Sequence, residues 1–240
     1  MLLALFALLL SGTTAVQPSP AVRGALGIGE PAAGGEPMAA AASVPVHRRR
    51  VVLSVAVESA AKVASLSGLA DEVRDIWRPY ADVDLVDDAR VDATGYDDRL
   101  SLVIVDRPRV GAANAMALGW IYFVGPGRPD RTITVSTAVA ATLMQSSLWG
   151  GFRMSELPRR AKEIFERRAL GRAIAHEVGH YLLRSSAHAA SGLMRETLNG
   201  AEIMERYPSQ LRLRREEIDL LRRSPAIMAS WPPASADVAQ

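Results

Sequence analysis

The chain contains no cysteine. This absence excludes disulfide bonds, a thiol nucleophile, an iron–sulfur cluster and every zinc site built on thiolate ligands. A metal ion in this protein must therefore be held by histidines and carboxylates. Only four of the 240 residues are histidine, so any cluster of histidines would be informative.

Aromatic residues and lysines are also scarce. Aromatic residues make up 5% of the chain, and Lys62 and Lys162 are its only lysines. Hydrophobic residues nevertheless reach 49%, which predicts a folded chain of one or two domains with an aliphatic core. The formal net charge of +2 is too close to neutral to favour a nucleic-acid partner, and we expect none.

The amino-terminal region indicates export rather than a fold. Residues 2–10 form an apolar run of nine residues, which is too short to span a bilayer. With the small residues Thr13 and Ala15 behind it, the run predicts a signal peptide over residues 1–15, although no Lys or Arg precedes it. The chain would then be secreted or periplasmic, with no stable membrane anchor after cleavage; the alternative is an apolar amino-terminal helix.

The rest of the chain divides into three parts. Residues 16–46 are rich in Pro, Gly and Ala and predict a low-complexity linker or pro-segment. Residues 47–223 carry alternating strand and helix patterns and predict the folded domain, whereas residues 224–240 read as a flexible tail. Apolar patterns predict strands at 51–57, 83–86, 100–105, 118–124 and 131–136, with helices at 59–77, 137–148, 155–183 and 209–223.

Two local signals refine these elements. The turn sequence Gly125-Pro126-Gly127 predicts a hairpin between strands 118–124 and 131–136. Ser155 is a favourable N-cap for the long helix, with Pro158 in its first turn.

The chemistry is concentrated in residues 176–194. His176 and His180 are four residues apart on the predicted helix 155–183, so both imidazoles lie on one face and could bind one zinc ion. Glu177 is placed to hydrogen-bond a water on that metal, which is the position of a general base in metal-assisted peptide hydrolysis. His188 follows eight residues after His180, so three of the four histidines fall within thirteen residues.

In this segment the sequence resembles the zincin metallopeptidases, and among them small bacterial secreted proteins of the metzincin, matrixin-like type. The motif likeness covers 176–194 and the layout likeness 51–223. It implies that His176, His180 and His188 bind Zn²⁺, that Glu177 is the general base, and that Met194 is the methionine of a Met-turn. It also implies an α+β fold: a twisted mixed five-stranded sheet, a backing helix, an active-site helix and a small helical carboxy-terminal subdomain.

The likeness has two departures. The third histidine of metzincins follows the second by six residues, whereas here the step is 188 − 180 = 8. Leu183 stands where the family has the glycine that ends the helix. We therefore expect a two-residue insertion in the turn, with the helix ending at Ser185 and Ser186.

The sequence thus predicts a secreted zinc endopeptidase that acts on peptides or proteins. The substrate would lie extended along strand 118–124; Tyr122 and Tyr181 are oxyanion candidates, although packing is the commoner role of such tyrosines. One alternative is a gluzincin-type site with Glu196 or Glu202 as the third ligand. Others are a non-catalytic zinc-binding domain, or a structural domain whose histidines only pack. The oligomeric state stays open.

Overall fold

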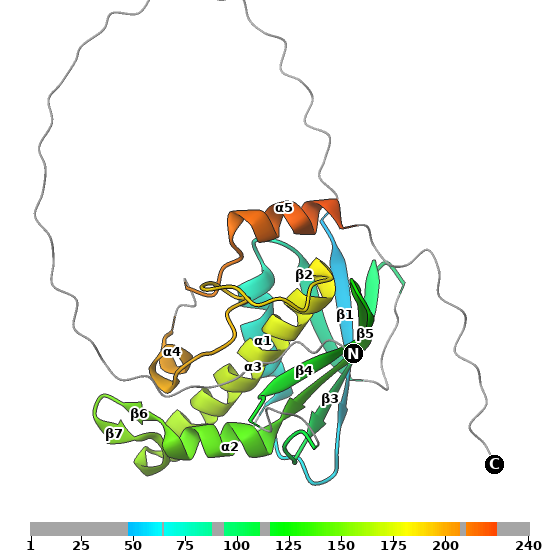
Figure 1. Ribbon diagram of the computed structural model, residues 1–240. Helices are drawn as coiled ribbons and strands as arrows, with labels where there is room; N and C mark the ends of the chain where they lie inside the picture. Colours follow the sequence, from blue (N-terminus) through cyan, green and yellow to red (C-terminus); the bar gives the residue numbers. More distant parts are fainter. Residues whose placement is uncertain (1–47, 64, 88–93, 111–115, 207–209, 225–240) are drawn as a thin grey trace, which may run out of the picture. The chain divides into compact units, whose positions relative to one another are not determined.

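A computed structural model describes residues 48–63, 65–87, 94–110, 116–206 and 210–224, which belong to one structural unit (Figure 1). The predicted signal peptide, the linker and nearly all of the tail lie outside the described residues. Within the described part, no helix has the length and apolar character needed to cross a membrane.

The centre of this unit is a five-stranded sheet in the order β2-β1-β3-β5-β4. Four of its strands run parallel, and β4 pairs antiparallel with β5 through the predicted hairpin. Their bounds are β1 Arg50–Val57, β2 Asp82–Asp87, β3 Asp98–Val105, β4 Gly119–Gly125 and β5 Arg128–Ser136. The predicted mixed sheet is confirmed in this coarse sense, and β4 forms one of its edges.

One face of the sheet forms the core with two helices. Alternate strand residues such as Leu53, Leu102 and Ile133 are fully buried on this face, as the two-residue period of a strand requires. Helices α1 (Leu66–Trp77) and α3 (Arg159–Leu183) cover it (Figure 1). The indole Nε1 of Trp77 donates to the carbonyl of Ala175 at 3.1 Å and fastens α1 to α3.

Both long helices begin later than the sequence predicts. The expected helix 59–77 starts at Leu66, because the Ser65 side chain caps it by accepting from the Gly68 amide at 3.1 Å. The Ser155 N-cap prediction is wrong: Ser155 lies in a short 3₁₀ turn, η2 (Met154–Glu156), and Pro158 is the residue before α3.

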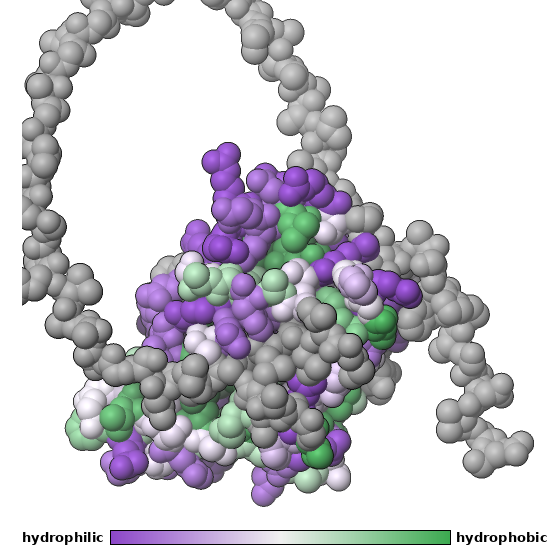
Figure 2. Space-filling model, viewed as in Figure 1, coloured by the Kyte–Doolittle hydropathy of each residue, from purple (hydrophilic) through white to green (hydrophobic). Residues whose placement is uncertain are grey.

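The remaining elements are small. Helix α2 (Thr137–Ser146) follows β5 directly, and the short hairpin β6 (Leu148–Trp149) and β7 (Phe152–Arg153) comes next. The predicted carboxy-terminal helix is shorter than expected, α5 (Arg215–Arg223), and is preceded by α4 (Gly200–Met204). Figure 2 shows hydrophilic side chains over α5 and apolar ones over the β6–β7 hairpin, where Leu148, Trp149 and Phe152 are exposed.

Candidate metal centre

The carboxy-terminal half of α3 contains His176, Glu177 and His180 and is buried in the protein interior. Every residue from Ala169 to Leu183 is buried, so this part of the helix is enclosed on all sides. His176, Glu177 and His180 are at most 1% exposed. Polar side chains this deep require partners or a ligand, because water cannot satisfy them.

The end of α3 differs from the expectation. The helix stops at Leu183, and Arg184 adopts a left-handed conformation with φ 51°. Its amide donates to the carbonyls of His180 and Tyr181, so the chain turns at Arg184 and not at Ser185 and Ser186. The Ser185 hydroxyl then accepts from the Ala187 amide at 3.2 Å, in the turn that leads to His188.

This turn brings His188 back to the two helical histidines. The ring of His188 lies 5.3 Å from that of His176 and 5.0 Å from that of His180, centroid to centroid. One ligand nitrogen from each of the three rings lies within 4.8 Å of the others. Within the described residues, these three histidines form a group that could hold a metal ion, and no carboxylate belongs to it.

Hydrogen bonds orient two of the rings toward this point. Nδ1 of His176 donates to the Leu193 carbonyl at 2.8 Å, and Nδ1 of His180 donates to the Ser185 carbonyl at 2.6 Å. A carbonyl can only accept, so in each neutral ring Nε2 carries a lone pair. The two Nε2 atoms face each other at 2.9 Å. Two lone pairs at this distance repel unless a cation lies between them, so the donor set fits a bound metal ion.

Burial also favours the neutral, metal-binding form of these histidines. Desolvation lowers the pKa of His180 to about 4 and holds the pKa of His176 well below its usual value. Desolvation also lowers the pKa of His188, and the negative charge of Glu196 partly opposes that shift. Nε2 of His188 is buried and has no hydrogen-bond partner in the described part of the chain.

Met194 packs against the part of α3 that carries the histidine motif. Its side chain is 2% exposed and packs against Gly179, where an added Cβ would lie 2.3 Å from the Met194 sulfur. The backbone around it is fixed, because the Met194 carbonyl accepts from the Ala189 amide at 2.8 Å. The Leu193 amide donates to the Arg212 carbonyl at 3.0 Å. Met194 thus packs against α3 at Gly179, the residue before His180, and its role as a Met-turn methionine stays a prediction.

The Glu177 side chain extends from α3 toward Gly119 of the edge strand β4. Its Cγ would be 3.2 Å from a Cβ added to Gly119, so a side chain at position 119 would require Glu177 to shift slightly. Neither carboxylate oxygen has a side-chain hydrogen-bond partner among the described residues, although the Ile121 backbone is close enough to interact with the carboxylate. Burial raises the pKa of Glu177 well above its usual value, and the charge of Arg109 and the nearby Ile121 backbone oppose that rise in part.

Other predicted residues lie elsewhere. The Tyr181 hydroxyl donates to the buried Asp98 carboxylate at 3.0 Å, so Tyr181 is a packing residue and not an oxyanion donor. The Glu202 carboxylate accepts from the Asn199 amide in a capping box and pairs with Arg195 at 2.8 Å. His188, in preference to Glu202 or Glu196, therefore completes the cluster.

Arg109 is the residue that the sequence analysis missed. It follows β3 in a loop and is 6% exposed. Its guanidinium carbon lies 4.9 Å from the ring centre of Tyr122 and 5.9 Å from that of Trp120, both on β4. No pattern in the sequence distinguishes Arg109 from the other arginines, because its place depends on how β3 and β4 come together.

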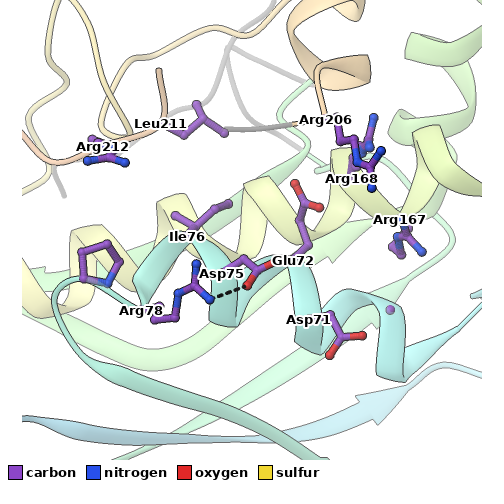
Figure 3. Close-up of a pocket in the computed structure, with 12 residues that line it drawn as sticks. Asp71, Glu72, Asp75, Ile76, Arg78, Arg167, Arg168, Arg206, Leu211 and Arg212 are labelled. Atoms are coloured by element: carbon purple, nitrogen blue, oxygen red, sulfur yellow. Dashed lines mark ion pairs between the residues drawn. The ribbon is translucent and has the colours of Figure 1, made fainter. Parts of the chain in front are cut away.

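Neither of two cavities is lined by the three histidines. One, of about 830 Å³, is lined by the end of β4 and its turn, Tyr122 to Gly127, and by the segment Arg184 to Ala187, which lies between α3 and His188 in the sequence. The other, of about 550 Å³, lies between α1, α3 and the segment before α5 (Figure 3). Both acidic and basic side chains line it, including the pair Asp75 and Arg78.

A scan against models of protein families finds no match for the sequence, and a comparison with curated proteins finds none either.

Proposed function

We propose that this chain is a zinc-dependent endopeptidase of the zincin, metzincin-like type, in which His176, His180 and His188 hold the metal. The observation that carries the proposal is the convergence of three imidazole nitrogens next to Glu177, a buried carboxylate that has no side-chain hydrogen-bond partner among the described residues. Three nitrogen ligands with no thiolate suit zinc, and they leave a fourth position open, as catalytic zinc sites do. When bound, zinc would polarise the scissile carbonyl and lower the pKa of water.

Glu177 performs the proton transfers in this proposal. Its carboxylate accepts a proton from the attacking water and then donates it to the leaving amine. Fixed contacts surround it: Gly119 of β4 approaches its Cγ, and its own helix is enclosed by the core. A general base held in this way needs little reorganisation when the substrate arrives.

The substrate would be an extended peptide or protein segment that pairs with the free edge of β4. This strand is the last of its sheet, and its hydrogen-bonded partner in the structure is β5 on one side only. Strand addition supplies main-chain hydrogen bonds, and pockets for alternate side chains then give specificity. The chain would act outside the cytoplasm, as the amino-terminal run of residues 2–10 predicts.

Metal content and peptide hydrolysis test the proposal in that order. The full chain, purified without chelator, should contain about one zinc by mass spectrometry. The His188→Ala variant should lose most of it, whereas His47→Ala, which removes the one histidine outside the motif, should retain it. Full zinc retention in His188→Ala would exclude the three-histidine site.

Hydrolysis separates an enzyme from a zinc-binding domain without activity. The zinc-loaded chain should cleave a mixed library of quenched fluorescent peptides. Glu177→Gln should lower the rate at least about 100-fold, as expected when a general base is removed, while it retains the metal. Zinc binding without cleavage of any library member would instead favour the non-catalytic domain.

A further inference from the structure

Arg109 lies beside Trp120 and Tyr122 of the edge strand β4. Its side chain is buried, and its Nη1 has no hydrogen-bond partner among the described residues. An arginine in this state is costly, because a buried charge without a partner loses its hydration. Such a group beside the edge strand is well suited to pair with an anionic group of a bound ligand.

Glu177 is near Arg109 but does not neutralise it. The charge of Arg109 lowers the pKa of Glu177, so the two groups are close enough to interact. Yet Nη1 of Arg109 has no hydrogen-bond partner in the described structure, and no hydrogen bond joins it to the Glu177 carboxylate. The two residues therefore do not satisfy each other, and each keeps its capacity to bind a third group.

Two aromatic rings lie next to the guanidinium of Arg109. Trp120 and Tyr122 are two residues apart on β4 and so point to the same face of the sheet. Gly119 and Ile121 alternate with them; Gly119 faces Glu177, and the Ile121 side chain enters the core. Aromatic rings accept no conventional hydrogen bond, so this contact leaves Nη1 of Arg109 available for a carboxylate.

We propose, on the premise of the function above, that Arg109 binds a carboxylate of the bound peptide. A strand added to the edge of β4 would direct every second side chain to the face that Trp120, Tyr122 and Arg109 share. The anionic group would be an acidic side chain at one of these alternate positions or the free carboxylate at the end of a short peptide. In both cases the fork of the guanidinium would pair with two carboxylate oxygens.

Binding to an inactive chain tests this proposal without a need for turnover. Zinc-loaded Glu177→Gln protein would be titrated by calorimetry with an acetylated hexapeptide of Ala and Gln in three forms. These are a neutral carboxy-terminal amide, the same peptide with a free carboxylate, and amides with one Glu at each position in turn. We expect one or more anionic forms to bind about 10- to 100-fold more tightly than the neutral amide, the range of a charge-assisted pair.

A matched pair of variants attributes the preference to one side chain. Arg109→Gln, added to Glu177→Gln, should abolish the preference, and Arg109→Lys should restore only part of it because lysine lacks the fork. Arg107→Gln is the control: it removes the same charge from the same loop, but Arg107 is exposed and pairs with Glu58. It should leave the preference unchanged.

The outcomes also separate the two sources of the carboxylate. Tighter binding of the free-carboxylate form alone assigns Arg109 to the peptide terminus, and tighter binding of Glu forms at alternate positions assigns it to side chains. Equal affinity for all forms, no measurable binding, or a preference that persists in Arg109→Gln would overturn the inference. If the wild-type chain hydrolyses no peptide but the Arg109-dependent preference is found, the endopeptidase proposal fails and the anion site remains.

Discussion

At the scale of single residues, the metal-facing geometry depends on backbone carbonyls. The Leu193 and Ser185 carbonyls accept from Nδ1 of His176 and His180 and thereby turn both Nε2 lone pairs to one point. Such outer partners fix ring orientation and tautomer in metal sites. The sequence spacing gives the two histidines a common face, but these carbonyl partners come from the turn after α3 and from the segment around Met194.

The contact between Gly179 and Met194 should be sensitive to one methyl group. In Gly179→Ala the new Cβ would lie 2.3 Å from the Met194 sulfur, so the Met194 side chain must shift away from α3. We expect a loss of about 1–3 kcal/mol in the free energy of unfolding, typical of overpacking, together with weaker zinc binding. Urea denaturation and zinc titration measure the two effects.

A second glycine provides the control for this substitution. In Gly125→Ala the new Cβ would meet only the Cδ of Arg128, at an ordinary 3.8 Å. Its stability should stay within about 0.5 kcal/mol of the parent. Equal effects at Gly125 and Gly179 would show that Met194 does not support the site as described.

At the scale of elements, the turn from α3 toward His188 depends on the backbone conformation of Arg184. Arg184 occupies the left-handed region, which disfavours any residue with a Cβ. Arg184→Gly should therefore be about 1 kcal/mol more stable than Arg184→Ala, because both lose the same side chain and only glycine relieves the strain. Thermal unfolding of the two variants, compared with each other, checks this; equal stabilities would contradict the strained turn.

Arg172 connects three helices, so its replacement should lower the free energy of unfolding more than the replacement of an exposed arginine. It is 2% exposed, pairs with Glu72 of α1 at 2.8 Å, and donates to the carbonyls of Glu202 and Glu205 in and after α4. Arg172→Leu leaves the Glu72 carboxylate without its partner, so we expect a loss of about 3–5 kcal/mol. The exposed pair of Arg159 and Glu163 is the control, and Arg159→Leu should cost less than about 1 kcal/mol.

Features that depend on neighbouring residues could be predicted from the sequence, whereas features that depend on long-range contacts could not. The spacing of His176 and His180, the strand 118–124 and the turn at Pro126 depend on neighbours in sequence, and the structure agrees with each. The predicted start of α1, at residue 59, and the predicted N-cap of α3 were wrong. Several residues near each helix start could serve as its cap, and such local signals are weak and of similar strength. Arg109 could not be found at all, since its partners on β4 meet it only after the sheet has formed.

At the scale of the whole molecule, the metal should contribute to stability as well as to chemistry. Its three proposed ligands come from two segments, α3 and the following turn, so a bound ion would join them in the native state only. A ligand that binds only the native state stabilises it by about 4 kcal/mol when its free concentration is 1,000 times the dissociation constant. For a domain of this size, that corresponds to a rise in Tm of about 8–16 °C.

Removal of the metal tests this linkage. We expect the Tm of the zinc-loaded chain to fall on dialysis against a chelator and to recover when zinc is returned. The His188→Ala variant lacks one of the three nitrogens, so its Tm should respond to zinc much less than that of the wild type. His47→Ala should respond as the wild type does. A wild-type Tm that is the same with and without zinc would mean that these histidines do not join the two segments through a metal.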